Sequence, residues 1–499
     1  YELSLFMVVS VVFTMIIAGA AWLPLILTAI ELMARRQPAL GGHPATLPWL
    51  TLGAAALGFQ ILAGHVEVTY YTLLIAGAYS AWRLVGLWLS HRKDRKGHKA
   101  ETENQTISAP DAPGRPFQGI AIQILQRASA LAALFFLGLL LGAIQLMPLY
   151  ELVRNNFRSG SATFDQIMGW AYPWRHAIAF LIPNFYGNPS HHGYFDLFTW
   201  RWSPAPLNNA TIDWGIKNYV EGGAYVGLLP LLLSAIVMSN WVISKWRKQP
   251  ITNYQLPTSQ SVIPFFALLA FFALAFAFPT RLYALIFWLP GINQLHSPFR
   301  WVWPLSLSVA VLSAYGIETL WRSRLPQSPY GYHVRRKATP GSVYRLSRIA
   351  APFFLWSEPS LITFFSGLAV WGGTITILML VAGRIWYARL AGLMDRLVLG
   401  AGPDPASDPL RLAKASEAFT DGRMFFSYEA RWILIFGLLL IASGIVLRLS
   451  RCPIYFRGRS VWEPLALGVI VLDLTAAGWG FNPAADPAIL SYVPPSVAF

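Results

Sequence analysis

Apolar segments long enough to cross a bilayer recur along the whole of this 499-residue chain. Hydrophobic residues make up 55% of the sequence and charged residues only 12%. A helix satisfies its own backbone hydrogen bonds in lipid, and about 20 apolar residues carry it across. We therefore expect an all-α fold, a polytopic transmembrane helical bundle of about ten spans forming a single transmembrane domain over residues 1–499. The expected spans are 5–33, 47–64, 68–90, 126–148, 219–243, 261–279, 300–321, 360–383, 431–449 and 461–478.

Lysine and arginine are distributed unevenly between alternate connections of this bundle. Residues 91–119 and 322–350 are rich in them, whereas residues 149–218 and 384–431 hold fewer for their length. Because short cytoplasmic loops carry the excess of positive charge, we expect the first two to be cytoplasmic basic loops and the last two to be outer-face loops. Both ends of the sequence then fall on the outer side. This topology accounts for much of the net charge of +15, so we expect membrane lipids and no nucleic acid among the partners.

A short polar turn separates two of the expected spans. It contains His65 and Glu67, two residues apart, between apolar segments. Ionisable groups at the membrane boundary are costly to place there, which favours a functional role. The alternative is a turn that only satisfies the exposed ends of two helices. Spacing alone does not decide between them.

The outer segment 149–218 is unusually aromatic, with Trp, Tyr and Phe spaced between Pro and Gly. This composition favours an ordered structure that lies along the membrane, because disordered segments have few aromatic residues. Aromatic side chains there suit anchoring at the lipid interface or stacking on sugar rings, and anchoring is the commoner role.

Signatures of soluble enzymes and metal sites are absent from the sequence. There is no Walker A motif, no dinucleotide-binding glycine pattern and no zinc-binding pair of histidines on a helix. The single cysteine, Cys452, excludes an intrachain disulfide. His191, His192 and Asp196 could hold a divalent ion, but a polar loop is the favoured interpretation. We therefore predict no cofactor and assign no metal-binding residues, and the sequence leaves dependence on a divalent metal open.

Charged groups next to the expected outer ends of the spans form two sets. Glu151 is followed by Arg154 and Arg158 at helical spacing, and Arg281 and His296 precede Arg300. A guanidinium held at this interface suits a lipid-linked phosphate, since its planar fork matches phosphate oxygens. The alternative is an ordinary contact with lipid headgroups. For Arg300 the functional role is favoured, because Pro298 restricts the backbone that carries it.

Several short motifs occur in the order found in a known family. They are Ala63-Gly64-His65-Val66-Glu67, Gln145-Leu146-Met147-Pro148, Ile182–Asn188, Tyr225–Pro230 and Pro298-Phe299-Arg300-Trp301. In these the chain resembles the YfhO-like bacterial membrane proteins, which are similar to GT-C glycosyltransferases. Val66 and Glu67 replace the usual Pro-Gln of the family's turn. The first-loop carboxylate that serves GT-C enzymes as base precedes the matched region, so we expect the sequence to be truncated at both ends.

The resemblance implies a multi-pass protein of the bacterial cytoplasmic (inner) membrane that moves a sugar from a polyprenyl-phosphate carrier to an acceptor on the outer face. His65 and Glu67 are the expected catalytic residues, with Glu221 and Asp165 as further candidate bases. The expected substrate-binding residues are Arg154, Arg158, Glu221, Arg281, His296 and Arg300. Two other functions stay open: a non-catalytic subunit that packs against other membrane subunits, and a transporter of lipid-linked sugars, which broken helices with ions at mid-membrane would indicate.

Overall fold

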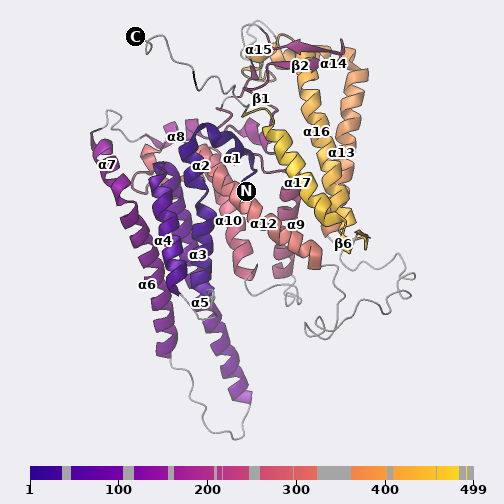
Figure 1. Cartoon of the computed structure of the whole chain (residues 1–499). Helices are drawn as coiled ribbons and strands as arrows, with labels where there is room; N and C mark the ends of the chain where they lie inside the picture. Colours follow the sequence, from indigo (N-terminus) through magenta and orange to yellow (C-terminus); the bar gives the residue numbers. More distant parts are fainter. Residues whose placement is uncertain are drawn as a thin grey trace, which may run out of the picture.

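The computed structural model is mostly helical, with 74% of its residues in helices and few strands (Figure 1). It describes residues 1–35, 46–104, 117–155, 162–206, 211–215, 217–246, 259–295, 297–322, 361–401, 408–456, 458–482 and 491.

Five of the described helices are long and apolar enough to cross a membrane, and a bent pair adds a sixth if it counts as one span. They are Thr14–Arg35, Val66–Leu89, Ile122–Leu141, Leu361–Ile385 and Gly422–Leu449, with Val262–Ala277 and Arg281–Phe287 as the bent pair. The chain is thus a helical membrane protein. Four of the ten expected spans are not among these described helices. Thr46–Leu62 and Leu228–Ile243 are apolar but shorter, and the helices at the expected spans 300–321 and 461–478, Val302–Arg322 and Trp462–Gly478, are not among the candidates either.

The N-terminal part of the chain is a bundle in which α3 packs on α4 and α5, and α4 packs on α6. Its elements are α1 (Leu5–Val9), η1 (Ser10–Val12), α2 (Thr14–Ala20), α3 (Leu23–Arg35), α4 (Thr46–Leu62), α5 (Val66–Asn104), α6 (Phe117–Leu141) and α7 (Ala143–Arg154). Small residues let α4 and α6 approach closely: a Cβ on Gly138 would lie 2.6 Å from the Leu57 side chain. Helix α5 continues to Asn104, so the first part of the expected loop 91–119 is helical.

The described residues of the aromatic segment 149–218 form short helices and strands over one end of the bundle, at the top of Figure 1. We call this end of the bundle the hairpin end. The segment's elements are α8 (Phe164–Trp170), η2 (Trp174–Phe180), β1 (Gly187–Asn188), β2 (Gly193–Asp196), β3 (Arg201–Pro204) and β4 (Ile212–Asp213). Strands β1 and β4 pair antiparallel, as do β2 and β3. Trp214 is buried in the centre, where its ring contacts Tyr186, Phe419 and Phe425. These aromatic contacts hold the segment against the C-terminal helices.

The middle of the chain contains a sharply bent helix. Its elements are α9 (Leu228–Trp246), α10 (Ser259–Ala277), η3 (Arg281–Tyr283), α11 (Ala284–Phe287), η4 (Ile292–Gln294), η5 (Pro298–Trp301) and α12 (Val302–Arg322). Helix α12 packs against both α9 and α10. The segments before and after Phe278–Thr280 differ in direction by 107°, and Pro279 lies in that break, where a helix would lose a backbone donor.

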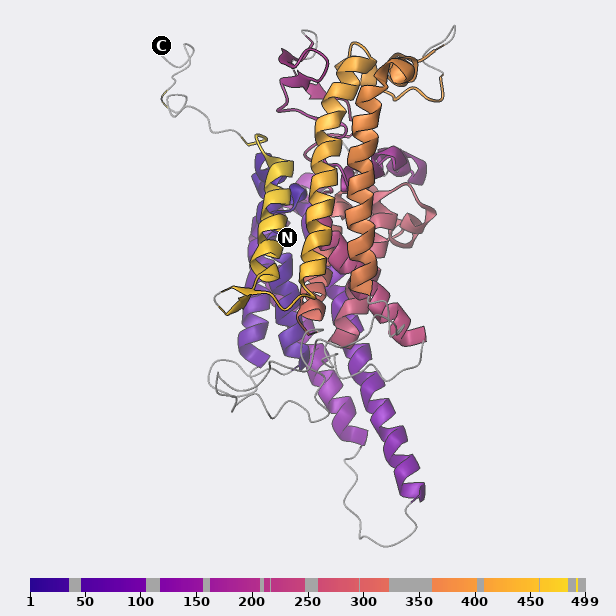
Figure 2. The same cartoon turned by 90° about the vertical axis from the view of Figure 1, so that its right-hand side faces the viewer.

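The C-terminal part is dominated by the long pair α13 and α16, which lie side by side (Figure 2). Its elements are α13 (Leu361–Ile385), α14 (Tyr387–Leu399), α15 (Ala415–Ala418), α16 (Gly422–Leu449), β5 (Tyr455–Phe456), β6 (Arg459–Ser460) and α17 (Trp462–Gly478). Glycines permit the close approach, since a Cβ on Gly373 would lie 2.5 Å from the Gly437 carbonyl oxygen.

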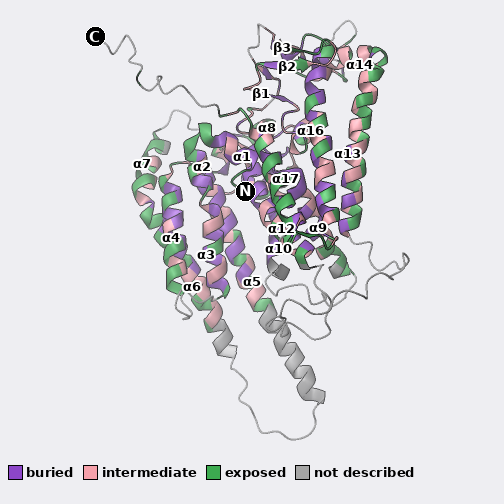
Figure 3. Cartoon of the chain, turned by 45° about the vertical axis from the view of Figure 1, so that its right-hand side comes forward, coloured by how far each residue is buried: buried purple, intermediate pink, exposed green. Residues whose placement is uncertain are grey.

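Apolar side chains remain exposed along the outer helices (Figure 3). Phe136 and Leu140 of α6 are exposed, as are Trp371 and Met379 of α13. Large apolar side chains at successive turns of a helix suit contact with lipid rather than with water.

The last helix is tied to the start of α9 by one carboxylate. Asp473 accepts a hydrogen bond from the Tyr225 hydroxyl at 2.5 Å and another from the Leu228 backbone N–H at 2.8 Å. Gly227, with φ of 89°, makes the turn that brings this N–H toward α17. Asp473 thus caps a helix that is distant in the sequence.

Candidate functional site

Arg300 is held in a fixed position by the residues on either side of it. Pro298 begins the short helix η5, and Phe299 and Trp301 are both buried. The Trp301 ring contacts Tyr71 of α5 and Phe276 of α10, at centroid distances of 4.7 Å and 4.9 Å. The side chain of Arg300 is only 16% exposed, so its guanidinium group faces the interior of the hairpin end.

Three predicted site residues surround this guanidinium group. Its Nη1 pairs with Oε2 of Glu67, and its Nη2 donates to Oε1 of Glu221 at 2.9 Å. Nε2 of His65 lies 3.3 Å from Nη1. His65 and Glu67 come from the turn between α4 and α5, Glu221 from the segment before α9, and Arg300 from η5. The structure therefore brings together His65, Glu67, Glu221 and Arg300, which we call the Arg300 cluster.

Both carboxylate oxygens of Glu67 have a hydrogen-bond partner. It lies in the first turn of α5, where the helix dipole favours a carboxylate. Its Oε1 accepts from the Tyr71 hydroxyl one turn later, at 3.1 Å, and its Oε2 is taken by Arg300. With a residue exposure of 7%, Glu67 is a group that fixes Arg300 rather than an open carboxylate.

His65 links the cluster to the backbone of α5. Gly64, at φ of 80°, ends α4, and Nδ1 of His65 then accepts from the Val68 backbone N–H at 3.2 Å. Burial and the nearby Arg300 charge lower the pKa of His65 to about 4, so the imidazole is neutral at pH 7. A neutral imidazole has one acceptor nitrogen. Only one of its contacts, to Val68 or to Arg300, is therefore a hydrogen bond at a given time.

Glu221 is the more open carboxylate. Its side chain is 27% exposed, and Oε2 accepts no hydrogen bond from the described part of the chain. The sequence analysis placed Glu221 inside a span, but α9 begins only at Leu228, so Glu221 lies in a turn. The reason is local packing: a Cβ on Gly223 would lie 3.3 Å from the backbone of Leu5.

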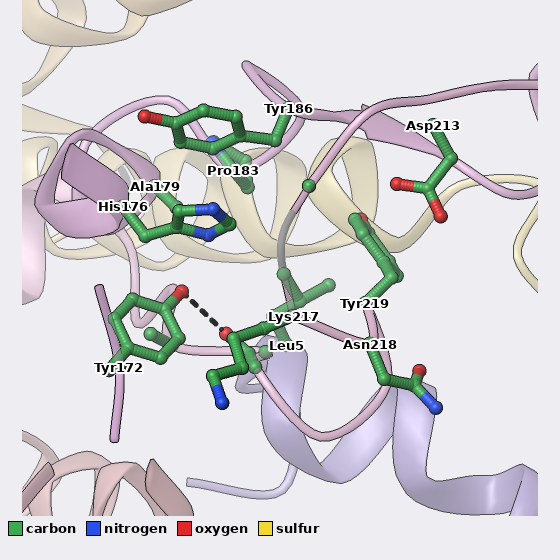
Figure 4. Close-up of a pocket in the computed structure, with 14 residues that line it drawn as sticks. Leu5, Tyr172, His176, Ala179, Pro183, Tyr186, Asp213, Lys217, Asn218 and Tyr219 are labelled. Atoms are coloured by element: carbon green, nitrogen blue, oxygen red, sulfur yellow. Dashed lines mark hydrogen bonds between the residues drawn. The ribbon is translucent and has the colours of Figure 1, made fainter. Parts of the chain in front are cut away.

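A small cavity adjoins the two glycines that follow Glu221 (Figure 4). The Tyr172 hydroxyl donates to the Gly222 carbonyl at 2.9 Å across its edge. Next to Tyr172, whose ring it contacts at a centroid distance of 5.5 Å, His176 stacks on Tyr186 with the ring centroids 3.9 Å apart. The cavity has a volume of about 30 Å³, which is enough for a few waters next to the turn.

Lys217 is a member of this site that the sequence analysis missed. Its Nζ lies 5.1 Å from the centroid of the Phe299 ring and donates to the Trp170 carbonyl at 2.5 Å. Burial lowers the pKa of Lys217, and the charge of Glu221 acts in the opposite direction. The only sequence signal was its position four residues before Glu221, in a segment that we interpreted as aromatic loop.

The formal charge of the Arg300 cluster is negative. One guanidinium group faces two carboxylates, and His65 is neutral. Nη1 and Nη2 both have carboxylate partners, and Nε is buried with no hydrogen-bond partner among the described residues. An arrangement of this kind offers an open carboxylate oxygen with an arginine fixed behind it, which suits the acceptance of a proton from a hydroxyl group.

No match for this chain was found among protein-family models, curated proteins or solved structures. The chemistry of the cluster is therefore interpreted from its own geometry.

Three of the other predicted residues, Arg154, Arg281 and Asp165, do not join the cluster. Arg154, at the end of α7, is exposed, with its guanidinium carbon 5.7 Å from the Tyr150 ring centroid. Arg281 at the start of η3 and Asp165 in α8 are both exposed. Arg158 and His296 lie outside the described residues. Within the described ranges, no group of three or more His, Cys, Asp or Glu side chains is placed to hold a metal ion.

Proposed function

We propose that this chain is a membrane glycosyltransferase of GT-C type, which moves a sugar from a polyprenyl-phosphate carrier to an acceptor hydroxyl at the extracytoplasmic face of the bacterial inner membrane. One observation carries the proposal: Arg300 is clamped between a closed carboxylate, Glu67, and an open one, Glu221, at the end of a membrane helix bundle. Transfer to a hydroxyl needs both a base and a fixed cation near the departing phosphate.

The roles within the cluster follow from which oxygens are free. Glu221 accepts the proton of the acceptor hydroxyl through its open Oε2. The hydroxyl oxygen then bonds to the anomeric carbon, while the bond from that carbon to the phosphate oxygen breaks and its electron pair leaves with the phosphate. Arg300, which contacts Glu221, and Lys217, which lies over Phe299, are the cations that we assign to stabilise that charge. Glu67 and His65 hold Arg300 in place. This assigns the base to Glu221 instead of Glu67.

A sugar-transfer assay in membranes tests this proposal. Membranes containing wild-type chain or Glu221→Gln are supplied with a panel of radiolabelled polyprenyl-phosphate hexoses, and label in the acceptor fraction is measured at matched protein level. We expect Glu221→Gln to lose activity by roughly 10²-fold or more, because the amide oxygen is not basic. Asp165→Asn is the matched control, since it changes an exposed carboxylate on α8 and leaves the cluster intact. Equal rates for wild type and Glu221→Gln would remove Glu221 as base.

A second candidate function is supported by the bend between α10 and η3. The two segments meet at 107°, and the Phe276 ring near the bend contacts Trp301 next to Arg300. Broken helices beside charged groups are typical of transporters. The measurement that separates the two functions is movement of a labelled lipid-linked sugar between leaflets of liposomes. Movement without transfer to any acceptor would favour transport, and transfer without movement would favour the glycosyltransferase.

A further inference from the structure

A second cavity lies away from the residues of the Arg300 cluster, between the β2–β3 hairpin and α16. Its volume is about 110 Å³. Since one water needs about 10–15 Å³ by this measure, the cavity has room for several waters or for one small ring. It is lined by the residues from Ser190 to Phe195, by Trp202, and by Ser427, Tyr428, Arg431 and Trp432 of α16.

The walls of this cavity combine aromatic and basic groups. Tyr194, Phe195 and Trp202 come from the hairpin, and Arg431 comes from α16. Its described lining also contains two histidines and two serines, but no aspartate or glutamate. Asp196, the last residue of β2, accepts hydrogen bonds from the Phe198 backbone N–H at 2.8 Å, from the Thr199 hydroxyl at 3.0 Å and from the hydroxyl of Ser427, a lining residue, at 3.5 Å. Among the side chains that line the cavity, Arg431 carries the full positive charge.

One wall is built by ordered contacts between the hairpin segment and α16. Nδ1 of His191 lies 2.7 Å from the Tyr428 hydroxyl, and the His191 ring stacks on Trp432 at 5.2 Å with an interplanar angle of 11°. The guanidinium carbon of Arg431 lies 5.0 Å from the centroid of the Trp432 ring. Arg431 is thus placed at the cavity, over an aromatic face, and adds a positive charge there. His191 adds none at pH 7, because burial and the charge of Arg431 lower its pKa to about 4.

The opposite wall is aromatic and open to solvent. Trp202 is 61% exposed and Phe195 is 38% exposed. Trp202 is also held close to the backbone, since a Cβ on Gly193 would lie 2.7 Å from its indole nitrogen. An indole that is ordered and exposed beside a cavity can stack on a sugar ring. Interface anchoring alone would not require a basic cavity behind it.

We propose that this cavity binds a single hexose unit that carries an anionic group, with the ring against Trp202 and the anion at Arg431. The shared chemistry is a polyhydroxylated ring with a phosphate or a carboxylate. The proposal does not depend on the chemistry at Arg300.

Saturation-transfer NMR on the full chain in detergent micelles tests this site with four probes: glucose 1-phosphate, glucuronate, glucose and inorganic phosphate. We expect the two anionic sugars to bind at least about tenfold more tightly than glucose, because they add a charge-assisted contact. Inorganic phosphate should bind more weakly than glucose 1-phosphate, because it lacks the ring. Arg431→Ala should remove the preference for the anionic sugars, and Trp202→Ala should weaken all three sugars about threefold to tenfold.

Two matched variants serve as controls. Arg423→Ala removes an arginine of the same helix whose guanidinium lies over Phe198, and Trp200→Ala removes an exposed indole of the same hairpin that does not line the cavity. Both should bind like wild type. If Arg431→Ala unfolds, Arg431→Gln replaces it, with folding checked by thermal unfolding. The proposal is overturned if wild type binds none of the sugars, if phosphate alone binds as tightly as glucose 1-phosphate, or if Arg431→Ala and Trp202→Ala leave binding unchanged.

Discussion

Two clusters of glutamate and arginine lie at the two ends of the apolar part of α5, roughly 24 Å apart. One cluster has more glutamates than arginines, and the other has more arginines than glutamates. At the hairpin end, one arginine, Arg300, is shared by two glutamates. At the other end, one glutamate, Glu31, is shared by two arginines: it pairs with Arg35 one turn later on α3 and lies 2.7 Å from Nε of Arg83 on α5. A tyrosine hydroxyl donates to a glutamate in each, Tyr71 to Glu67 and Tyr79 to Glu31.

The difference lies in what each cluster leaves free. Both oxygens of Glu31 have partners, and the surplus charge is a cation on α3 or α5. In the Arg300 cluster the surplus is the carboxylate of Glu221, which is partly exposed and keeps an open oxygen. A cluster with a surplus cation at a helix end suits contact with lipid headgroups. A cluster with an open carboxylate oxygen suits the acceptance of a proton from a hydroxyl group. The predictions below test this division.

The largest effect is expected for Arg300→Ala. The substitution leaves the buried Glu67 without its cation, so we expect the free energy of unfolding to fall by about 3 kcal/mol. We also expect sugar transfer to fall by roughly 10²–10³-fold, since a fixed cation is lost near the departing phosphate. Thermal unfolding in detergent and the membrane transfer assay measure the two effects.

Arg300→Lys and Arg300→Ala combined with Glu67→Gln sharpen this result. Lysine lacks the planar fork that reaches two carboxylates, so Arg300→Lys should recover only part of the activity. The double variant should recover stability but not activity, because the unpaired charge has gone while the cation is still missing. If the double variant regained transfer, the role of Arg300 would be structural.

A smaller effect is expected for Arg83→Ala at the other cluster. Glu31 keeps Arg35 and the Tyr79 hydroxyl, at 2.7 Å, so we expect unfolding to become easier by only about 1 kcal/mol. Sugar transfer should stay within about twofold of wild type, because Arg83 lies roughly 24 Å along α5 from the Arg300 cluster. A loss of transfer comparable to that of Arg300→Ala would show that the two clusters do not have separate roles.

The last prediction concerns His65 and is visible only as the pH falls below 6.5. Its pKa is about 4 in the folded chain and about 6.5 in an unfolded one. A lowered histidine pKa means that stability is complete above pH 6.5 and declines as the pH falls toward 4, because only the unfolded state then takes up the proton. The Tm of His65→Asn, which can still cap α5, should therefore fall less than that of wild type between pH 7 and pH 4.5. Parallel Tm curves for the two proteins would contradict the neutral state of His65.

The sequence predicted the members of the Arg300 cluster better than their arrangement. His65, Glu67 and Arg300 were recognisable because each stands beside a local structural signal, Gly64 for the turn and Pro298 for η5. Their association could not be read from the chain, since Arg300 is 233 residues from Glu67. Lys217 was missed for the same reason: only the fold places it over Phe299.

The predicted helix boundaries were wrong where capping and packing, rather than a run of apolar residues, decide where a helix begins. Helix α16 begins at Gly422, before the predicted start at residue 431, because Asp421 caps it by accepting from the Met424 backbone N–H at 2.8 Å. Charged residues in that first part hid the helix from a search for apolar runs. Glu429 is one of them, and both of its carboxylate oxygens are buried with no hydrogen-bond partner among the described residues. We have no physical account of that glutamate.

The carboxylate of Asp473 sets an order for assembly of the site during synthesis. The Leu228 N–H at the start of α9 and the Tyr225 hydroxyl both depend on a side chain from the last helix of the chain. While the ribosome is still making α13 and α16, the Leu228 N–H and the Tyr225 hydroxyl have no acceptor from α17, and this segment is held by its contacts with Leu5 and Tyr172. The last bonds that fix the segment between Glu221 and α9 therefore form only once α17 is in place.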